Sequence, residues 1–384
     1  MRICQDDGSP ALSGLRTPIC DLFGVRYPIV QTGMGFVSGP QLTAATANAG
    51  GLGILASATM SFAELAVAIE QTRRLTDAPF GVNLRADARD ARQRAELLIR
   101  ERVKVASFAL APRQELIAML KAGGVVVVPS IGARRHAEKV AAWGADAVIV
   151  QGGEGGGHTG PVATTVLLPQ VVDAVDIPVI AAGGFFDGRG LVAALAYGAA
   201  GIAMGTRFLL TADSQVPAAI KDLYLRAAVA DTVVTTALDG VPQRLLRTPF
   251  TDRLAHDGSF ARLVRSVRSA AVFRRLTGAS WNALVRQGLE LRKAHGVPLL
   301  QVLLAANTPA LLKAAMVDGR PEFGVMATGQ VAGVIEDLPS CADLIACIIA
   351  EAEAILAGFA GCGSAPDAPG RLGASQTDAD GEER

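Results

Sequence analysis

Short apolar runs alternate with amphipathic segments along most of this chain of 384 residues. Each run is bounded by Gly, Pro, Asn or Ser, which is typical of buried parallel strands. The runs cover Tyr27–Gln31, Leu52–Leu55, Phe80–Leu84, Val105–Leu110, Val125–Pro129, Ala147–Val150, Val179–Ala182 and Ile202–Met204. The segments between them carry apolar residues at helical spacing, as at Phe62, Leu65 and Ile69. The pattern therefore predicts strands that alternate with helices.

Eight strand–helix units are the number that closes a parallel barrel, whereas an open doubly wound sheet rarely needs eight parallel strands. The alternation stops after the eighth run and recovers in an amphipathic helix over Leu338–Leu356. We therefore expect an α/β fold, a (β/α)8 TIM barrel with a helical insertion after the eighth strand. The expected parts are a flexible leader (1–16), a barrel (17–210 and 325–358), a helical, substrate-covering insertion (211–324) and a disordered tail (363–384).

Composition narrows the class of protein. The 36 Lys and Arg residues balance the 36 Asp and Glu residues, so charge gives no support to a nucleic-acid or membrane partner. The five cysteines are scattered, and none stands at metal-ligand spacing, which predicts reduced thiols and no metal site. Neither a signal peptide nor a long apolar span is visible. These features favour a cytoplasmic protein that acts on a small molecule.

Glycines crowd the loops after the last three strand-like runs, and barrel active sites form on such loops. The loops are Gln151–Gly160, Gly183–Gly188 and Gly205–Arg207. Glycine allows positive φ and a close approach of backbone N–H groups to an anion. Because barrels commonly bind phosphate after strands seven and eight, we expect a ligand with a phosphate monoester. The residues expected at this phosphate are Gly183, Gly184, Gly205 and Thr206.

His158 is the candidate for proton transfer. It lies among glycines rather than on an apolar helical face, and imidazole titrates near neutrality. Glu154 in the same loop either orients the imidazole or is solvated. Polar side chains that can hydrogen-bond a heteroaromatic ring such as isoalloxazine end three of the runs, at Asn83, Ser130 and Gln151.

With these residues in view, the chain resembles the nitronate monooxygenase (2-nitropropane dioxygenase) family of FMN-dependent TIM barrels over about residues 17–358. The most specific match is the loop from Gln151 to His158, which is close to the family's Q-G-x-E-A-G-G-H. Further matches are Phe80–Asn83, Ala181–Gly184, Met204–Phe208 and Gly329–Gly333. The resemblance implies that His158 is the catalytic base and that FMN is the cofactor. Together with the residues above, the expected cofactor set is Gly33, Met34, Asn83, Ser130, Gln151, Gly156, Gly183, Gly184, Gly205 and Thr206.

One departure from the family pattern concerns the first loop. It reads Gln-Thr-Gly-Met from Gln31 to Met34, where the family typically has Q-A-P-M, and this argues against nitronate turnover. Three segments of the chain are similar to those of a narrower branch of the family. They are Gln-Thr-Gly-Met-Gly, Ala-Ser-Phe-Ala-Leu-Ala-Pro and Gly-Gly-Glu-Gly-Gly-Gly-His-Thr-Gly. That branch acts on coenzyme A thioesters in bacterial steroid and cholesterol degradation. The resemblance implies a dehydrogenase or reductase that introduces, or reduces, a ring double bond in a C/D-ring hydroxyindane carboxyl-CoA.

A basic stretch fits a coenzyme A substrate. From Arg244 to Lys293 the local charge is +8, and Arg262, Arg265 and Arg268 are spaced to share one side of a helix. Guanidinium groups suit the phosphates of coenzyme A, so these three arginines are the expected substrate contacts. A solvated helical face, or a subunit interface in a homo-oligomer, explains the same charges equally well.

Three other functions compete with a flavin-dependent acyl-CoA oxidoreductase. The first is a nitronate monooxygenase that oxidises alkyl nitronates with O₂. The second is a non-redox lyase or isomerase whose barrel binds a sugar phosphate, and the third is a binding or scaffold protein without flavin. Flavin content distinguishes the nitronate monooxygenase from the lyase or isomerase and from the scaffold protein. The substrate distinguishes the nitronate monooxygenase from the acyl-CoA enzyme.

Overall fold

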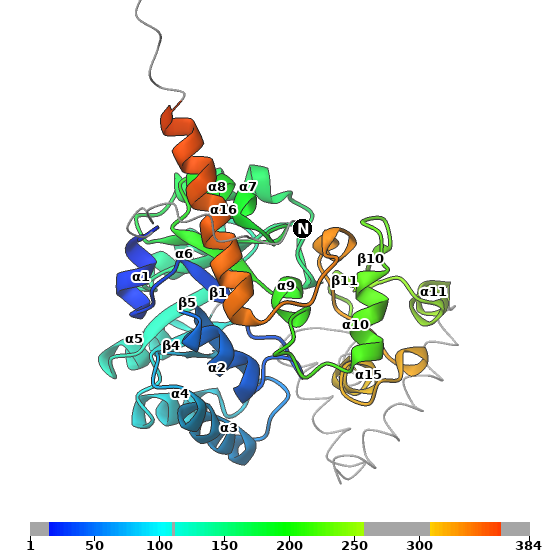
Figure 1. Cartoon of the computed structure of the whole chain (residues 1–384). Coiled ribbons are helices and arrows are strands. Elements are labelled where there is room, and N and C mark those ends of the chain that lie inside the picture. The colour runs from blue at the N-terminus through cyan, green and yellow to red at the C-terminus, as the bar shows by residue number, and fades with distance from the viewer. Residues whose placement is uncertain (1–14, 110–111, 257–307, 362–384) are drawn as a thin grey trace, which may run out of the picture.

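A closed barrel of parallel strands forms the centre of the described chain (Figure 1). The computed structural model describes residues 15–109, 112–256 and 308–361. Its barrel strands are β1 (Ile29–Gln31), β2 (Leu52–Ala56), β3 (Gly81–Leu84), β4 (Val105–Phe108), β5 (Val126–Ile131), β6 (Val148–Gln151), β8 (Val179–Ala182) and β9 (Gly201–Met204). Neighbours pair in parallel, and β9 closes the barrel on β1. The predicted (β/α)8 barrel is confirmed.

The apolar runs become strands because both of their faces are buried. Val30, Ile54 and Val105 belong to one apolar cluster that includes residues from most of the barrel strands. Their neighbours along the chain, such as Ile29, pack in a second cluster against the helices. Strands with two buried faces read as continuous apolar runs, so the sequence located them well. The short helix α1 (Pro18–Phe23) adds Ile19 and Phe23 to the first cluster.

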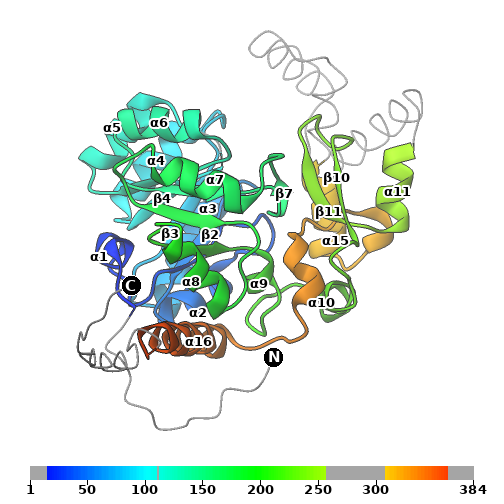
Figure 2. The same ribbon diagram turned by 90° about the horizontal axis from the view of Figure 1, so that it is seen from above.

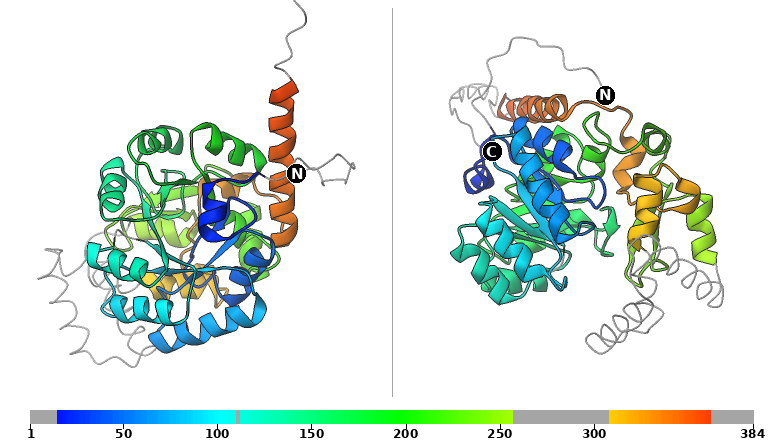
Figure 3. Two further views of the ribbon diagram at one scale, coloured as in Figure 1. Left: turned by 90° about the vertical axis from the view of Figure 1, so that its left-hand side faces the viewer. Right: turned by 90° about the horizontal axis from the view of Figure 1, so that it is seen from below.

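Helices surround the barrel between successive strands. They are α2 (Pro40–Asn48), α3 (Phe62–Leu75), α4 (Ala91–Arg100), α5 (Gln114–Ala122), α6 (Arg134–Ala142), α7 (Thr164–Val172) and α8 (Gly188–Ala196). The last helix, α16 (Cys341–Gly361), packs against α8 and α2 and so returns the chain to the barrel wall (Figure 3). The buried Arg207 fixes this return, because its Nη1 donates to Asp337 Oδ1 at 2.7 Å just before α16 begins.

The region between β9 and α16 lies beside the barrel (Figure 2). Its helical elements among the described residues are α9 (Thr206–Leu209), α10 (Ala218–Leu225), α11 (Pro249–His256), α15 (Thr308–Met316), η1 (Pro321–Phe323) and η2 (Gln330–Val334). It also holds an antiparallel pair, β10 (Thr232–Thr235) and β11 (Gln243–Leu246), which the predicted helical insertion did not include. β11 pairs in turn with β7 (Gly157–His158), so one small sheet joins the insertion to the glycine-rich loop.

Within the described ranges, no helix is long and apolar enough to cross a membrane. The same residues hold no group of three or more His, Cys, Asp or Glu side chains placed to bind a metal ion.

Candidate active site

A cavity of about 340 Å³ opens at the carboxyl ends of the barrel strands. His158 and every residue expected to bind the cofactor line this one cavity. They are Gly33, Met34, Asn83, Ser130, Gln151, Gly156, Gly183, Gly184, Gly205 and Thr206. The structure therefore brings together residues from six different strand ends. The volume lies within the range of about 300–1,000 Å³ that is usual for ligand pockets.

The loop after β1 is fixed from inside the protein. Gln31 is fully buried, and its Nε2 donates to Ser38 Oγ at 2.8 Å and to the Ile54 carbonyl at 3.2 Å. Ser38 Oγ accepts from the Met34 N–H at 2.9 Å and donates to the Thr32 carbonyl at 2.9 Å. These bonds hold Gly33 and Met34 at the cavity wall.

Gly33 packs directly against Asn83 at the end of β3. A Cβ added at Gly33 would lie only 2.5 Å from the Asn83 Cβ, so the position accepts no side chain in this arrangement. Asn83 is 8% exposed, and its Nδ2 donates to Ser107 Oγ at 2.8 Å. Ser107, which the sequence did not single out, also lines the cavity. Its place in the middle of an apolar run was the available signal.

Two positive-φ glycines shape the far wall of the cavity. Gly183 and Gly184 have φ of 92° and 90° after β8, a backbone conformation that residues other than glycine rarely adopt. A Cβ at Gly184 would meet nothing nearer than 3.8 Å, which leaves its backbone accessible. Thr206 stands beside them after β9, and its Oγ1 accepts from the Gly329 N–H at 2.9 Å. The open backbone at Gly184 is of the kind that can approach an anion closely.

The glycine-rich loop after β6 is held at both of its ends. Gln151 Nε2 donates to the His158 carbonyl at 2.7 Å, which closes the loop on itself. Glu154 accepts at 3.0 Å from the Thr164 N–H and at 2.7 Å from Thr164 Oγ1, at the start of α7. Glu154 is therefore neither a partner of the imidazole nor merely solvated. A Cβ at Gly156 would lie 2.5 Å from the carbonyl carbon of Thr328, so this glycine allows a second segment to close on the loop.

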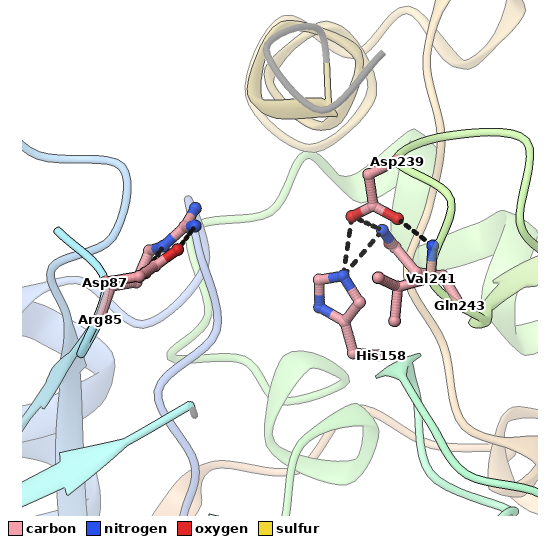
Figure 4. Close-up of polar contacts among 6 residues, drawn as sticks. All are labelled: Arg85, Asp87, His158, Asp239, Val241 and Gln243. Atoms are coloured by element: carbon pink, nitrogen blue, oxygen red, sulfur yellow. Dashed lines mark hydrogen bonds and ion pairs between the residues drawn. The ribbon is translucent and has the colours of Figure 1, made fainter. Parts of the chain in front are cut away.

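His158 meets a carboxylate that the sequence did not single out (Figure 4). Its Nε2 lies 2.7 Å from Oδ2 of Asp239, which belongs to the turn between β10 and β11. Gln243 Nε2 donates to the same Asp239 oxygen at 2.6 Å. The Asp239 side chain is 11% exposed, whereas that of His158 is 60% exposed. The imidazole is thus open to a ligand on one side and bound on the other.

Burial alone would raise the pKa of Asp239. The hydrogen bond and charge of His158 oppose this effect, as do the Val241 N–H at 3.0 Å and Gln243. The result is a pKa below the ordinary value, so Asp239 is a carboxylate at neutral pH. A signal for this turn was present: Asp239-Gly240 separates the β-branched run Thr232–Thr235 from a second short run.

The arginines of the basic stretch divide into two groups. Arg262, Arg265 and Arg268 lie outside the described residues. Arg244 is described, and its Nη2 donates to the Gly153 carbonyl at 2.8 Å while its Nη1 donates to Thr232 Oγ1 at 2.9 Å. This arginine therefore holds the glycine-rich loop to the insertion.

The chain is similar to curated relatives over nearly its full length. It is 62% identical over 341 residues to a Rhodococcus jostii protein, and the match covers 89% of this chain and 97% of the relative. It is 63% identical over 342 residues to a Mycobacterium tuberculosis protein, and that match covers 88% of this chain and 96% of the relative. Both relatives are named (3aS,4S,5R,7aS)-5-hydroxy-7a-methyl-1-oxo-octahydro-1H-indene-4-carboxyl-CoA dehydrogenase.

Solved structures and a family model agree with this similarity. FabK from Thermotoga maritima superimposes with a TM-score of 0.75 and 35% identity, and the match covers 91% of this chain and 99% of that one. Residues 16–97 and 90–351 match the nitronate monooxygenase family. With its barrel, its glycine-rich loop and its histidine at the cavity, this chain belongs to the nitronate monooxygenase family of oxidoreductases.

Proposed function

We propose that this protein is an FMN-dependent dehydrogenase that introduces a ring double bond into a bicyclic, steroid-derived acyl-CoA. One observation carries the proposal: His158 and all expected cofactor residues line a single cavity in a chain that is 62% and 63% identical to two enzymes named for such a thioester. The two relatives carry the same name, and the matches cover 96–97% of their own length, which supports the same substrate class.

The lining of the cavity supports flavin mononucleotide as the cofactor. Gly183, Gly184 and the Gly205–Thr206 step line the cavity, and their backbone would bind the phosphate. Asn83, Ser130 and Gln151 would hydrogen-bond the ring system, and Gly33 and Met34 would lie against it. A bound flavin supplies the two-electron acceptor that a dehydrogenation requires.

His158 supplies the base. Its imidazole lines the cavity and remains open on the side away from Asp239. In the proposed reaction it takes the proton from the carbon next to the thioester carbonyl, the most acidic C–H of such a substrate. A positioned base of this kind contributes roughly 10²–10⁴-fold to the rate. Arg262, Arg265 and Arg268 are proposed to bind the phosphates of coenzyme A.

Nitronate oxidation is the competing activity, because the family is named for it. The Gly33 contact argues against nitronate turnover. Where the family pattern has proline in the first loop, this chain brings Asn83 so close that the Cβ of any side chain would lie 2.5 Å from the Asn83 Cβ. The wall beside the proposed flavin is therefore shaped differently from the Q-A-P-M form.

Flavin absorbance and two substrates test the proposal together. The purified protein should carry FMN and should remove two hydrogen atoms from the hydroxyindane carboxyl-CoA, detected by mass spectrometry, with little turnover of propionate 3-nitronate. His158→Ala should keep the flavin and lose about 10²-fold or more of kcat. His136→Ala, an exposed histidine on α6, is the matched control and should change neither. A colourless protein that takes up no FMN, or rapid nitronate turnover without thioester turnover, would overturn it.

A further inference from the structure

The hydrogen bonds of His158 distinguish its two ring nitrogens. Nε2 faces Asp239 Oδ2 at 2.7 Å and Gln243 Nε2 at 3.2 Å. Nδ1 makes no hydrogen bond to the residues that the structure describes, and Figure 4 shows it turned away from Asp239 toward the open side of the ring. The two nitrogens are therefore placed for different tasks.

Two side-chain nitrogens share one carboxylate oxygen of Asp239. Gln243 Nε2 is 2.6 Å from Asp239 Oδ2, and a carboxylate only accepts hydrogen bonds. The amide of Gln243 and Nε2 of His158 therefore both donate to the same oxygen, which accounts for their own separation of 3.2 Å. With the proton on Nε2, the lone pair of the neutral imidazole lies on Nδ1.

Strand pairing sets this arrangement. Gln243 is the register partner of His158 in the β7–β11 ladder, and Asp239 stands four residues before Gln243 in the turn. The hairpin of the insertion, rather than the barrel, thus orients the imidazole. We propose that Asp239 is a positioning residue that holds the His158 proton on Nε2, so that Nδ1 is the atom that takes the substrate proton. The inference rests on the proposed function for the identity of that proton.

Other charges near the imidazole are already engaged. Glu154 of the same loop bonds Thr164, and Arg244 beside Gln243 on β11 bonds the Gly153 carbonyl. Arg85, shown opposite His158 in Figure 4, forms an ion pair with Asp87 at 2.6 Å. The pKa of Arg85 is raised mainly by the Asp87 hydrogen bond against desolvation, with the charge of Asp239 adding to the effect. Among these groups Asp239 alone touches the imidazole.

Nitrogen NMR tests the tautomer without any catalytic turnover. The chain has four histidines, so ¹⁵N-histidine labelling of the FMN-loaded protein gives few signals, and His158→Gln identifies the relevant pair. In the neutral form, Nε2 should carry the proton in the wild type, and Asp239→Asn should mix the two tautomers because an amide can donate as well as accept. A neutral wild-type His158 with its proton on Nδ1 would overturn the inference.

Kinetics provides the second test. Asp239→Asn should lower kcat by about 10²-fold with little change in KM or flavin content, and Asp239→Glu should recover part of the loss. Asp318→Asn, which removes an exposed partner of Lys313, is the control. An Asp239→Asn enzyme with the wild-type kcat would contradict the inference, whereas full activity in His158→Ala would contradict the proposed function.

Discussion

Replacing Gly156 with alanine tests the closure of the cavity by steric contact alone. The new Cβ would lie 2.5 Å from the Thr328 carbonyl carbon, 2.7 Å from the Gly329 nitrogen and 2.9 Å from the Thr328 oxygen. All three are backbone atoms, so no rotamer change relieves the overlap and the two segments must separate. Overpacking of this kind costs about 1–3 kcal/mol. Gly329 also donates to Thr206 Oγ1 at 2.9 Å, so the displacement reaches the proposed phosphate site.

Two measurements follow this change. Urea unfolding of Gly156→Ala should show a free energy of unfolding lower by about 1–3 kcal/mol. Fluorescence titration of the apoprotein with FMN should show a dissociation constant raised by about tenfold, which corresponds to 1.4 kcal/mol. Gly160→Ala is the matched control in the same loop, because its Cβ would meet nothing nearer than the Gly132 oxygen at 3.8 Å. If Gly156→Ala and Gly160→Ala behave alike in both assays, the steric reasoning is wrong.

Three further predictions concern buried charge and a buried thiol. Arg207→Met should lower the free energy of unfolding by about 1–3 kcal/mol in a denaturant titration, because it removes the ion pair with Asp337. Asp337 is 40% exposed and can be hydrated again, which limits the loss. An unchanged unfolding midpoint would contradict a stabilising ion pair. Burial raises the pKa of Cys341 to about 12, so mass spectrometry should find no iodoacetamide on this cysteine in the native protein at pH 8 and full labelling after denaturation; rapid native labelling would show that it is exposed. The lowered pKa of Asp239 stabilises the fold above the ordinary carboxyl range and ceases to do so as pH falls through the folded value. The stability difference between wild type and Asp239→Asn should therefore shrink below roughly pH 4, and a constant difference would refute this linkage.

The barrel was predictable because its strands and loops depend on patterns of apolar residues and glycines that are local in the sequence. Parallel strands buried on both faces need continuous apolar runs, and the strand from Val105 to Phe108 is buried at every position. The glycines after β8 were equally visible, since positive φ at Gly183 and Gly184 favours one residue type. Elements that depend on such local rules can be located without the structure.

The pair of His158 and Asp239 was not predictable because it depends on pairing between segments that are distant in the sequence. β7 has only two residues, and nothing in Gly157–His158 indicates a strand until β11 lies beside it. Asp239 is separated from His158 by 81 positions, so their contact follows from the fold of the insertion. Glu154 shows the converse: proximity in sequence suggested a partner for the imidazole, but the Thr164 N–H at the start of α7 binds that carboxylate.

The proposed function is tested most directly by an anaerobic titration of the purified, FMN-loaded protein with the hydroxyindane carboxyl-CoA, followed by visible absorbance. The thioester should bleach the oxidised flavin in the wild type, whereas His158→Ala should bind the same flavin without rapid bleaching. A wild-type flavin that remains oxidised with the thioester and is bleached by propionate 3-nitronate would contradict the proposed function.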